Sequence, residues 1–173
     1  MAVVVVGYNE MLLVCDCLRS LRQITYQPLL VIYVDNDSPD GTLDRVRSTF
    51  PEVIAVASGG NLGYCGGNNV GICRALEAGA DFVLILNPDT VVCNPGFLTA
   101  LIDYTLAHPA VGKAGPKVYL RQYGNVQNTI LAWPSIAGSL FSVLGSFMPG
   151  RRVTKSETIT VPEEVPSLNG CCL

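Results

Sequence analysis

Apolar and polar residues alternate along this chain in blocks that predict strands and helices in turn. Short apolar runs rich in β-branched residues are typical of strands covered on both faces. Such strands are expected at residues 2–7, 29–34, 53–57 and 81–86. Helices are expected at residues 11–21, 42–50, 68–78 and 95–106, the first of them capped by Asn9 and Glu10. This order predicts an α/β fold with a mainly parallel sheet flanked by helices on both faces.

Beyond Pro109 the pattern becomes less regular. Residues 111–119 predict a further strand, and residues 155–166 are polar enough for a loop. Residues 125–150 contain no charged side chain and are numerous enough to span a bilayer. Prolines, glycines and serines interrupt this uncharged stretch, so a buried or partly interfacial helical segment is favoured over the alternative of a membrane span. An interfacial segment would give peripheral membrane association.

A polar cluster follows each of the four expected strands. These clusters lie at residues 8–9, 35–40, 61–69 and 87–90. In a parallel sheet the carboxyl ends of the strands meet at one edge, and ligands bind there. The sequence therefore predicts that the four clusters converge and bind a polar ligand.

Composition narrows the class of protein. The chain has 173 residues, of which 49% are hydrophobic and 14% charged, which suits one globular domain with a real core. The net charge of -3 gives no reason to expect nucleic-acid binding, so an anionic ligand must be held by local features. The seven cysteines are odd in number and scattered through apolar segments. Free thiols in a reducing compartment, and hence a cytoplasmic protein, are expected.

Two common nucleotide-binding motifs are missing. No G-x-G-x-x-G follows the first strand, and no G-x-x-x-x-G-K-[ST] occurs in the chain. The sequence therefore disfavours a dinucleotide-dependent dehydrogenase and a P-loop NTPase.

Five blocks of sequence nevertheless form a recognisable series. They are VVVGYN at 4–9, VDNDSPDGT at 34–42, NLGYCGGNNVGI at 61–72, LNPDT at 86–90 and PGFL at 95–98. In this order and spacing the chain resembles family 2 of the glycosyltransferases, and within it the rhamnosyltransferase-like members. The resemblance implies the GT-A fold, with residues 1–173 as one domain that is incomplete at its C-terminus. Residues 1–108 would form the nucleotide-sugar-binding half, and residues 109–173 would begin a truncated acceptor half.

The resemblance also implies a donor site for a UDP- or dTDP-sugar. Tyr8 would stack on the pyrimidine base, and Asp35 would accept the imide hydrogen, because an ionised carboxylate is an acceptor only. Asn36 is a candidate for nucleoside contact. Asn61 and Gly67 are candidates in the glycine-rich loop, where a backbone without side chains can approach a ligand closely.

The turn at Asn87-Pro88-Asp89 occupies the place of the family's acid-x-acid metal motif. Asp89 is the expected ligand of Mg or Mn, which would also hold the donor diphosphate. Asn87 stands in place of the first acid and offers a neutral carbonyl oxygen. Asp37 and Asp40, in the turn after the second strand, are expected to be structural because Asp favours turns for backbone reasons.

No catalytic residue is assigned, because an inverting transfer needs a general base and the family's acid-rich motif is expected beyond Leu173. Two interpretations stay open. The first is an inverting glycosyltransferase, with rhamnose suggested by the resemblance, that acts on a saccharide or lipid-linked acceptor at the inner face of the membrane. The alternative is a non-catalytic nucleotide-sugar-binding module or a degenerate glycosyltransferase.

Overall fold

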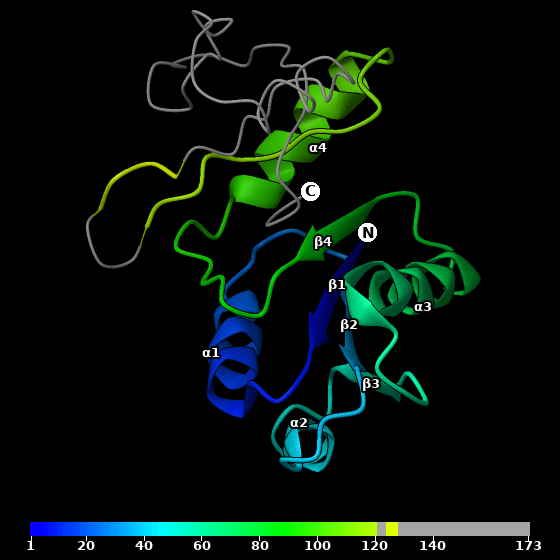
Figure 1. The fold of residues 1–173 in the computed structure, drawn as a ribbon. Coiled ribbons are helices and arrows are strands. Elements are labelled where there is room, and N and C mark those ends of the chain that lie inside the picture. Colours follow the sequence, from blue (N-terminus) through cyan, green and yellow to red (C-terminus); the bar gives the residue numbers. More distant parts are fainter. Residues whose placement is uncertain (121–123, 128–173) are drawn as a thin grey trace, which may run out of the picture. The chain divides into compact units, whose positions relative to one another are not determined.

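The computed structural model describes residues 1–120 and 124–127. Its centre is a four-stranded sheet made of β1 (Ala2–Gly7), β2 (Leu30–Asp35), β3 (Ile54–Ala57) and β4 (Val83–Leu86). The strands lie in the order β3-β2-β1-β4, and every neighbouring pair is parallel (Figure 1). Met1–Pro116 belong to one compact unit, and the described residues from Lys117 on belong to another.

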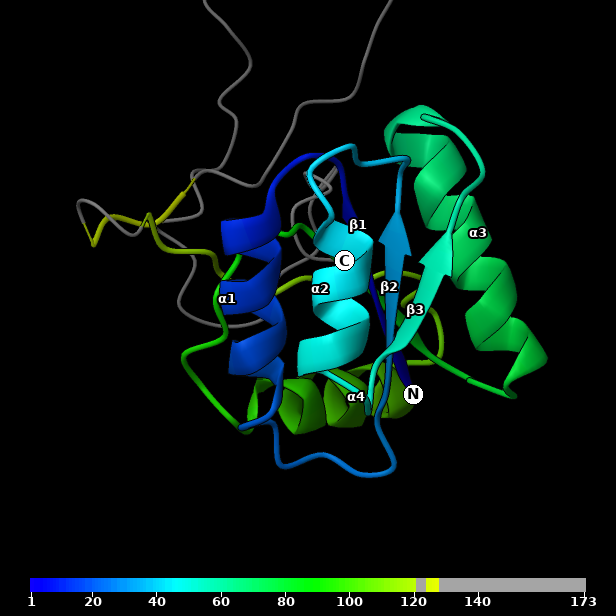
Figure 2. The ribbon, with the colours of Figure 1, turned by 90° about the horizontal axis from the view of Figure 1, so that it is seen from below.

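Helices cover both faces of this sheet. The helices of the described ranges are α1 (Met11–Leu21), α2 (Thr42–Thr49), α3 (Gly63–Glu77) and α4 (Phe97–Ala107), of which α1, α2 and α3 pack against the strands. Seen along the sheet, α1 and α2 lie on one face and α3 lies on the other (Figure 2). The chain therefore changes face after β3 and places β4 on the far side of β1. The eight elements expected up to residue 107 are all present, and the predicted α/β fold with a parallel sheet flanked by helices is confirmed.

The central strand β1 is buried on both faces. Ala2 and Val4 form one core cluster with Ile32, Val34 and Ala75, beneath α3. Val3 and Val5 are equally inaccessible to solvent. They point to the opposite face because successive strand residues alternate. Full burial of such a side chain stabilises the fold by about 1.5–3 kcal/mol, so the β-branched run fixes this strand in the middle of the sheet.

Helix α3 begins earlier than the sequence predicts. The glycine-rich stretch was expected to stay a loop as far as Gly67, with a helix from residue 68, but the helix starts at Gly63. A Cβ on Gly67 would lie 2.6 Å from Val6 Cγ1, and one on Gly71 would lie 2.2 Å from Val4 Cγ1. The glycines therefore let the helix backbone approach β1 closely, and this packing overrides their low helix propensity.

The side-chain cap expected for α1 is also wrong. Asn9 does not cap α1 with its side chain, and Glu10 at the cap position makes no such bond either. Asn9 has a φ of 57°, and its backbone N–H donates to the Ser38 hydroxyl instead. The backbone just before α1 is thus held by the loop after β2.

The strand expected at residues 111–119 is not formed. Within the described residues this segment has one isolated antiparallel bridge, from Tyr119 to Val126. Gly112, Gly115 and Pro116 explain the difference, because glycine weakens a strand and proline cannot donate to a ladder.

None of the helices in the two described ranges is long and apolar enough to cross a bilayer. Most of the uncharged stretch, residues 128–150, lies outside the described residues, as does the polar segment at residues 155–166.

Candidate functional site at the carboxyl edge of the sheet

The polar clusters converge at one edge of the sheet, as predicted. Gly7 pairs with Asp35, and Asp35 pairs with Ala57, so β1, β2 and β3 end level with one another. On the other side of β1, Val5 pairs with Leu86 at the end of β4. The chain reverses its winding between β1 and β4. In doubly wound sheets, such a switch point at the carboxyl edge is where ligands bind.

Asp35 lies at this edge with its carboxylate held from two sides. The Tyr33 hydroxyl donates to Oδ1 at 2.9 Å, and the Ser38 backbone N–H donates to Oδ2 at 2.8 Å. Burial, followed by the nearby Asp35 carboxylate, raises the pKa of Tyr33 well above its usual range. Only 3% of Asp35 is exposed. Its first partners are therefore protein groups, and the contact with a base imide stays a prediction.

Asn36 faces the loop that precedes α3. Its Nδ2 donates to Asn61 Oδ1 at 3.1 Å and to the Gly63 carbonyl at 3.3 Å. Its Oδ1 accepts from the Leu62 N–H at 3.0 Å, and Asn61 Oδ1 also accepts from the Gly63 N–H. With 4% of Asn36 exposed, the residue organises this loop. Its nucleoside contact stays a prediction, as does that of the exposed Asn61.

Tyr8 is the aromatic side chain that β1 delivers to this edge. Nearly half of the residue, 48%, is exposed. The next residue, Asn9, is tied to the loop after β2 through its 3.0 Å bond to Ser38. Tyr8 thus combines an accessible ring with an anchored backbone, which suits stacking on a ligand base.

The two aspartates assigned to structure take backbone roles. Asp40 Oδ1 accepts hydrogen bonds from the hydroxyl and the N–H of Thr42, the first residue of α2. The Thr42 hydroxyl first, and then the backbone amides of Thr42 and Met11, hold the pKa of Asp40 below its usual range. Asp37 has a φ of 72°, a conformation typical of Asp in turns.

The turn after β4 presents Asp89. The Thr90 N–H donates to the Asn87 carbonyl at 3.1 Å and closes a four-residue turn with Pro88 and Asp89 at its centre. Asp89 is exposed, and within residues 1–120 and 124–127 no hydrogen bond or ion pair occupies its carboxylate.

The described residues contain no group of three or more His, Cys, Asp or Glu side chains that could hold a metal by themselves. One free carboxylate nevertheless fits a divalent cation of the Mg type. Such ions are commonly bound through one or two carboxylates together with the phosphates of a substrate. Asp89 is therefore the residue that would hold the cation, and Asn87 is its half-buried neighbour.

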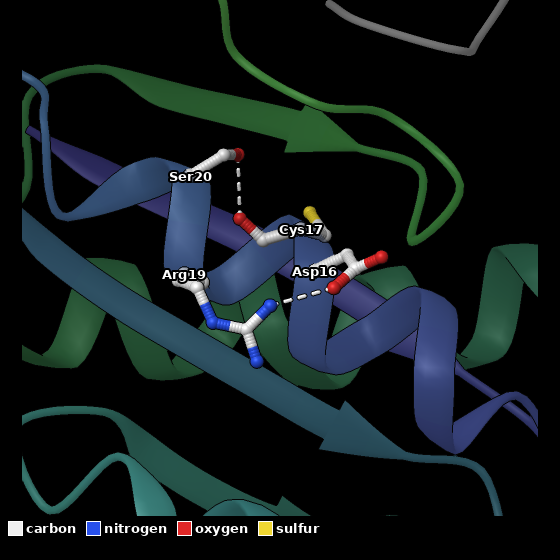
Figure 3. Close-up of polar contacts among 4 residues, drawn as sticks. All are labelled: Asp16, Cys17, Arg19 and Ser20. Carbon is white, nitrogen blue, oxygen red and sulfur yellow. Dashed lines mark hydrogen bonds and ion pairs between the residues drawn. The ribbon is translucent and has the colours of Figure 1, made fainter.

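Sequence reasoning missed a set of contacts between α1 and the segment after this turn. The Cys17 thiol donates to the Asn87 carbonyl at 3.8 Å, and the Ser20 hydroxyl accepts from the Val92 N–H at 3.0 Å. Figure 3 shows Cys17 and Ser20 on α1, with the ion pair between Asp16 and Arg19 beside them. The three-residue spacing of Cys17 and Ser20 is a helical signal that could have placed them on one face. Cys15, Cys65, Cys73 and Cys93 are free thiols.

A parallel sheet wound in both directions, with polar loops at its switch point, defines the class of α/β proteins that bind their ligands at the carboxyl edge. Solved glycosyltransferases share the fold. One is a mannosyltransferase from Pyrobaculum calidifontis in complex with GDP-Man and Mn²⁺, with a TM-score of 0.57, 24% identity, and coverage of 70% of this chain and 36% of that one. Another is S. aureus TarS 1-349, with a TM-score of 0.54, 20% identity, and coverage of 76% and 41%.

The model of glycosyl transferase family 2 matches residues 2–163, and the chain belongs to this family. A curated relative is the N-acetylglucosaminyl-diphospho-decaprenol L-rhamnosyltransferase of Mycobacterium tuberculosis. It is 34% identical over 169 residues, which cover 90% of this chain and 54% of the relative. The chain thus spans about half the length of the curated relatives that it matches.

Proposed function

We propose that this chain forms the donor-binding part of a glycosyltransferase that takes a sugar from a nucleoside diphosphate. The observation that carries the proposal is the placement of Tyr8 and Asp89 on the segments that leave the adjacent strands β1 and β4. An aromatic ring and a free carboxylate at one switch point match the two ends of such a donor, a base and a diphosphate. Membership of family 2 supports the same conclusion.

Different residues at this edge of the sheet bind different parts of the donor. Tyr8 stacks on the base, and Asp35 and Asn36 keep the neighbouring loops in place while they face the nucleoside. Asn61 and Gly67 lie beside the sugar or nucleotide. Asp89, with Asn87 next to it, holds the divalent cation. When bound, Mg or Mn stabilises negative charge on the departing diphosphate.

The finer assignments follow the relatives. The curated relative is an L-rhamnosyltransferase whose name specifies a sugar on a diphospho-decaprenol. We therefore propose L-rhamnose from a dTDP- or UDP-linked donor, and a lipid-linked saccharide as acceptor. With such an acceptor, the protein is proposed to act in the cytoplasm at the inner face of the membrane. The proposed transfer is inverting, and none of the described carboxylates is assigned as its base.

The donor site is tested by titrating UDP and dTDP calorimetrically with and without Mn²⁺. In the wild type, we expect Mn²⁺ to raise the affinity for one of them at least tenfold, roughly 1.4 kcal/mol. Asp89→Ala and Asp89→Asn should lose this enhancement because each removes the charged ligand. Asp81→Ala is the matched control, because Asp81 is also exposed but lies just before β4, at its opposite end.

Absence of metal-enhanced binding to either nucleotide in the wild type would rule out the donor site. An equal increase of nucleotide affinity by Mn²⁺ in wild type and Asp89→Ala would instead show that other residues bind the cation. An assay of donor hydrolysis or sugar transfer, which detects the released nucleoside diphosphate, distinguishes an active transferase from a module that binds donor without turnover.

A further inference from the structure

The segment between the cation turn and α4 is fixed without regular secondary structure of its own. Residues 90–94 form neither helix nor strand, yet Val92 is buried. A buried backbone N–H or carbonyl needs a hydrogen-bond partner. Both groups of Val92 find one on α1 or the turn just after it, because Ser20 Oγ accepts from its N–H at 3.0 Å and Gln23 Nε2 donates to its carbonyl. Side chains of α1 and of the turn that follows it therefore satisfy the backbone as a neighbouring strand would.

The direction of the Ser20 contact is set within the helix. The Ser20 hydroxyl donates its proton to the Cys17 carbonyl at 2.7 Å, as the dashed line in Figure 3 shows. A hydroxyl has one proton and two lone pairs, so Ser20 is left as an acceptor toward Val92. Since the bond is buried, no water competes for it, and the register of Val92 against α1 is fixed.

The same face of α1 reaches the turn itself. The Cys17 thiol donates to the Asn87 carbonyl, the oxygen that also accepts from Thr90 to close the turn. At the far end of the segment, the N–H and the hydroxyl of Thr25 both donate to the Pro95 carbonyl, at 3.0 and 3.1 Å. The segment is therefore anchored before, within and after the region that carries Asp89.

We propose that Cys17, Ser20 and Gln23 are positioning residues for the cation turn, a role that rests on the donor site proposed above. Asp89 projects between two anchored points, Asn87 and Val92. Its carboxylate has no protein partner in the described part of the chain, so its direction depends on how firmly these points are held. A preorganised ligand loses less conformational freedom when it binds. The anchors should therefore strengthen the cation-dependent part of donor binding.

Ser20→Ala tests the inference, because it leaves the Val92 N–H without an acceptor. We measure the affinity for UDP and dTDP with and without Mn²⁺, and the amide hydrogen exchange of Thr90 and Val92. The ratio of metal-bound to metal-free affinity should fall about three- to tenfold, as expected for the loss of one buried hydrogen bond. Metal-free affinity should stay within about twofold, while the two amides exchange faster. A merely structural loss would lower both affinities together.

Ser48→Ala is the matched control. Ser48 donates to the Arg45 carbonyl at 3.0 Å, the same bond to the residue three positions earlier, but on an exposed face of α2. Arg19→Ala is a second control on α1, because it breaks only the exposed pair with Asp16. Both controls should keep the wild-type metal ratio.

Gln23→Ala provides a second route if Ser20→Ala does not fold, because Gln23 is exposed and its loss leaves the core intact. It should also lower the metal ratio. An unchanged ratio in a folded anchor variant, or a parallel fall of both affinities, would overturn the positioning role alone. A wild type without any metal enhancement would overturn the donor site instead, and with it the role of the anchors.

Discussion

The hydroxyl of Tyr33 donates a hydrogen bond to Oδ1 of Asp35 at 2.9 Å, at the end of β2. The two side chains share one face of the sheet because they are two residues apart on a strand. Tyr33 is fully buried, and Ser38 occupies the other carboxylate oxygen. The carboxylate proposed to face the nucleoside is thus oriented by the core beneath it.

Tyr33→Phe should destabilise the protein by about 1–3 kcal/mol, because it leaves a buried carboxylate oxygen without its donor. Urea unfolding measures the change. Tyr104→Phe is the control, since this half-buried tyrosine on α4 contacts His108 through its ring and should change stability by less than about 0.5 kcal/mol. Equal stability of Tyr33→Phe and wild type would show that the hydroxyl contributes nothing.

Alkaline pH should reveal the same bond. The pKa of Tyr33 is raised by burial first and by Asp35 second. A raised folded-state pKa means that the stabilisation is fully present below the unfolded pKa of about 10. It is lost progressively as pH rises above that value, because tyrosine ionises in the unfolded chain first. Between pH 9 and 11 the wild type should lose more stability than Tyr33→Phe, and the groups common to both cancel. Parallel pH profiles would contradict this.

Asn36→Asp should destabilise the fold by about 2 kcal/mol. The substitution removes the two hydrogen bonds that Asn36 Nδ2 donates. The new carboxylate oxygen would then face the Asn61 and Gly63 oxygens that accept these bonds in the wild type. Asn36→Ala should cost somewhat less, because it removes the bonds without adding repulsion. Urea unfolding and amide exchange of Leu62 report the effect. Asn69→Asp, at an exposed position of α3, is the control.

Gly71→Ala should cost more than about 2 kcal/mol, because its Cβ would lie 2.2 Å from Val4 Cγ1 in a filled core. Gly60→Ala has nothing within 4 Å and should be nearly neutral. Thermal unfolding compares the two. A second substitution, Val4→Ala, should recover part of the loss in Gly71→Ala by making room. Failure of this rescue would contradict the close approach of α3 to β1.

Tyr8→Ala should weaken UDP or dTDP binding about five- to tenfold, the range expected when one base loses its aromatic stacking partner. Tyr8→Phe should bind within about twofold of the wild type because it keeps the ring. Fluorescence or calorimetric titration measures both. Neither variant should change the unfolding free energy much, since the residue is half exposed. A large loss in Tyr8→Phe would assign the contact to the hydroxyl.

The strands and most helix positions could be predicted because local apolar patterns determine them. The early start of α3 could not, since it depends on Gly67 and Gly71 meeting Val6 and Val4, which are about sixty residues away along the chain. Local propensity alone treats these glycines as a loop. The strand expected at residues 111–119 is absent for a local reason. Gly112 and Pro116 oppose a strand more strongly than the apolar residues of this segment favour one.

The location of the candidate site followed from strand order, but the partners of its residues did not. Asn36 binds the loop at Asn61, and Asp35 is held by Tyr33 and Ser38. Hydrogen bonds of this kind depend on where separate loops come together, and the composition of either loop alone does not encode them. The contacts of α1 with Asn87 and Val92, which span about seventy residues, were missed for the same reason.

The anchoring of the cation turn by α1 also fixes how this helix can vary in length. Cys17 and Ser20 share a face because they stand about one helical turn apart. Inserting or deleting a single residue before them would rotate both by about 100° and turn them away from Asn87 and Val92. Insertions and deletions within α1 before Cys17 should therefore disturb the position of Asp89. Changes in the length of the loop after Thr25 should leave it in place.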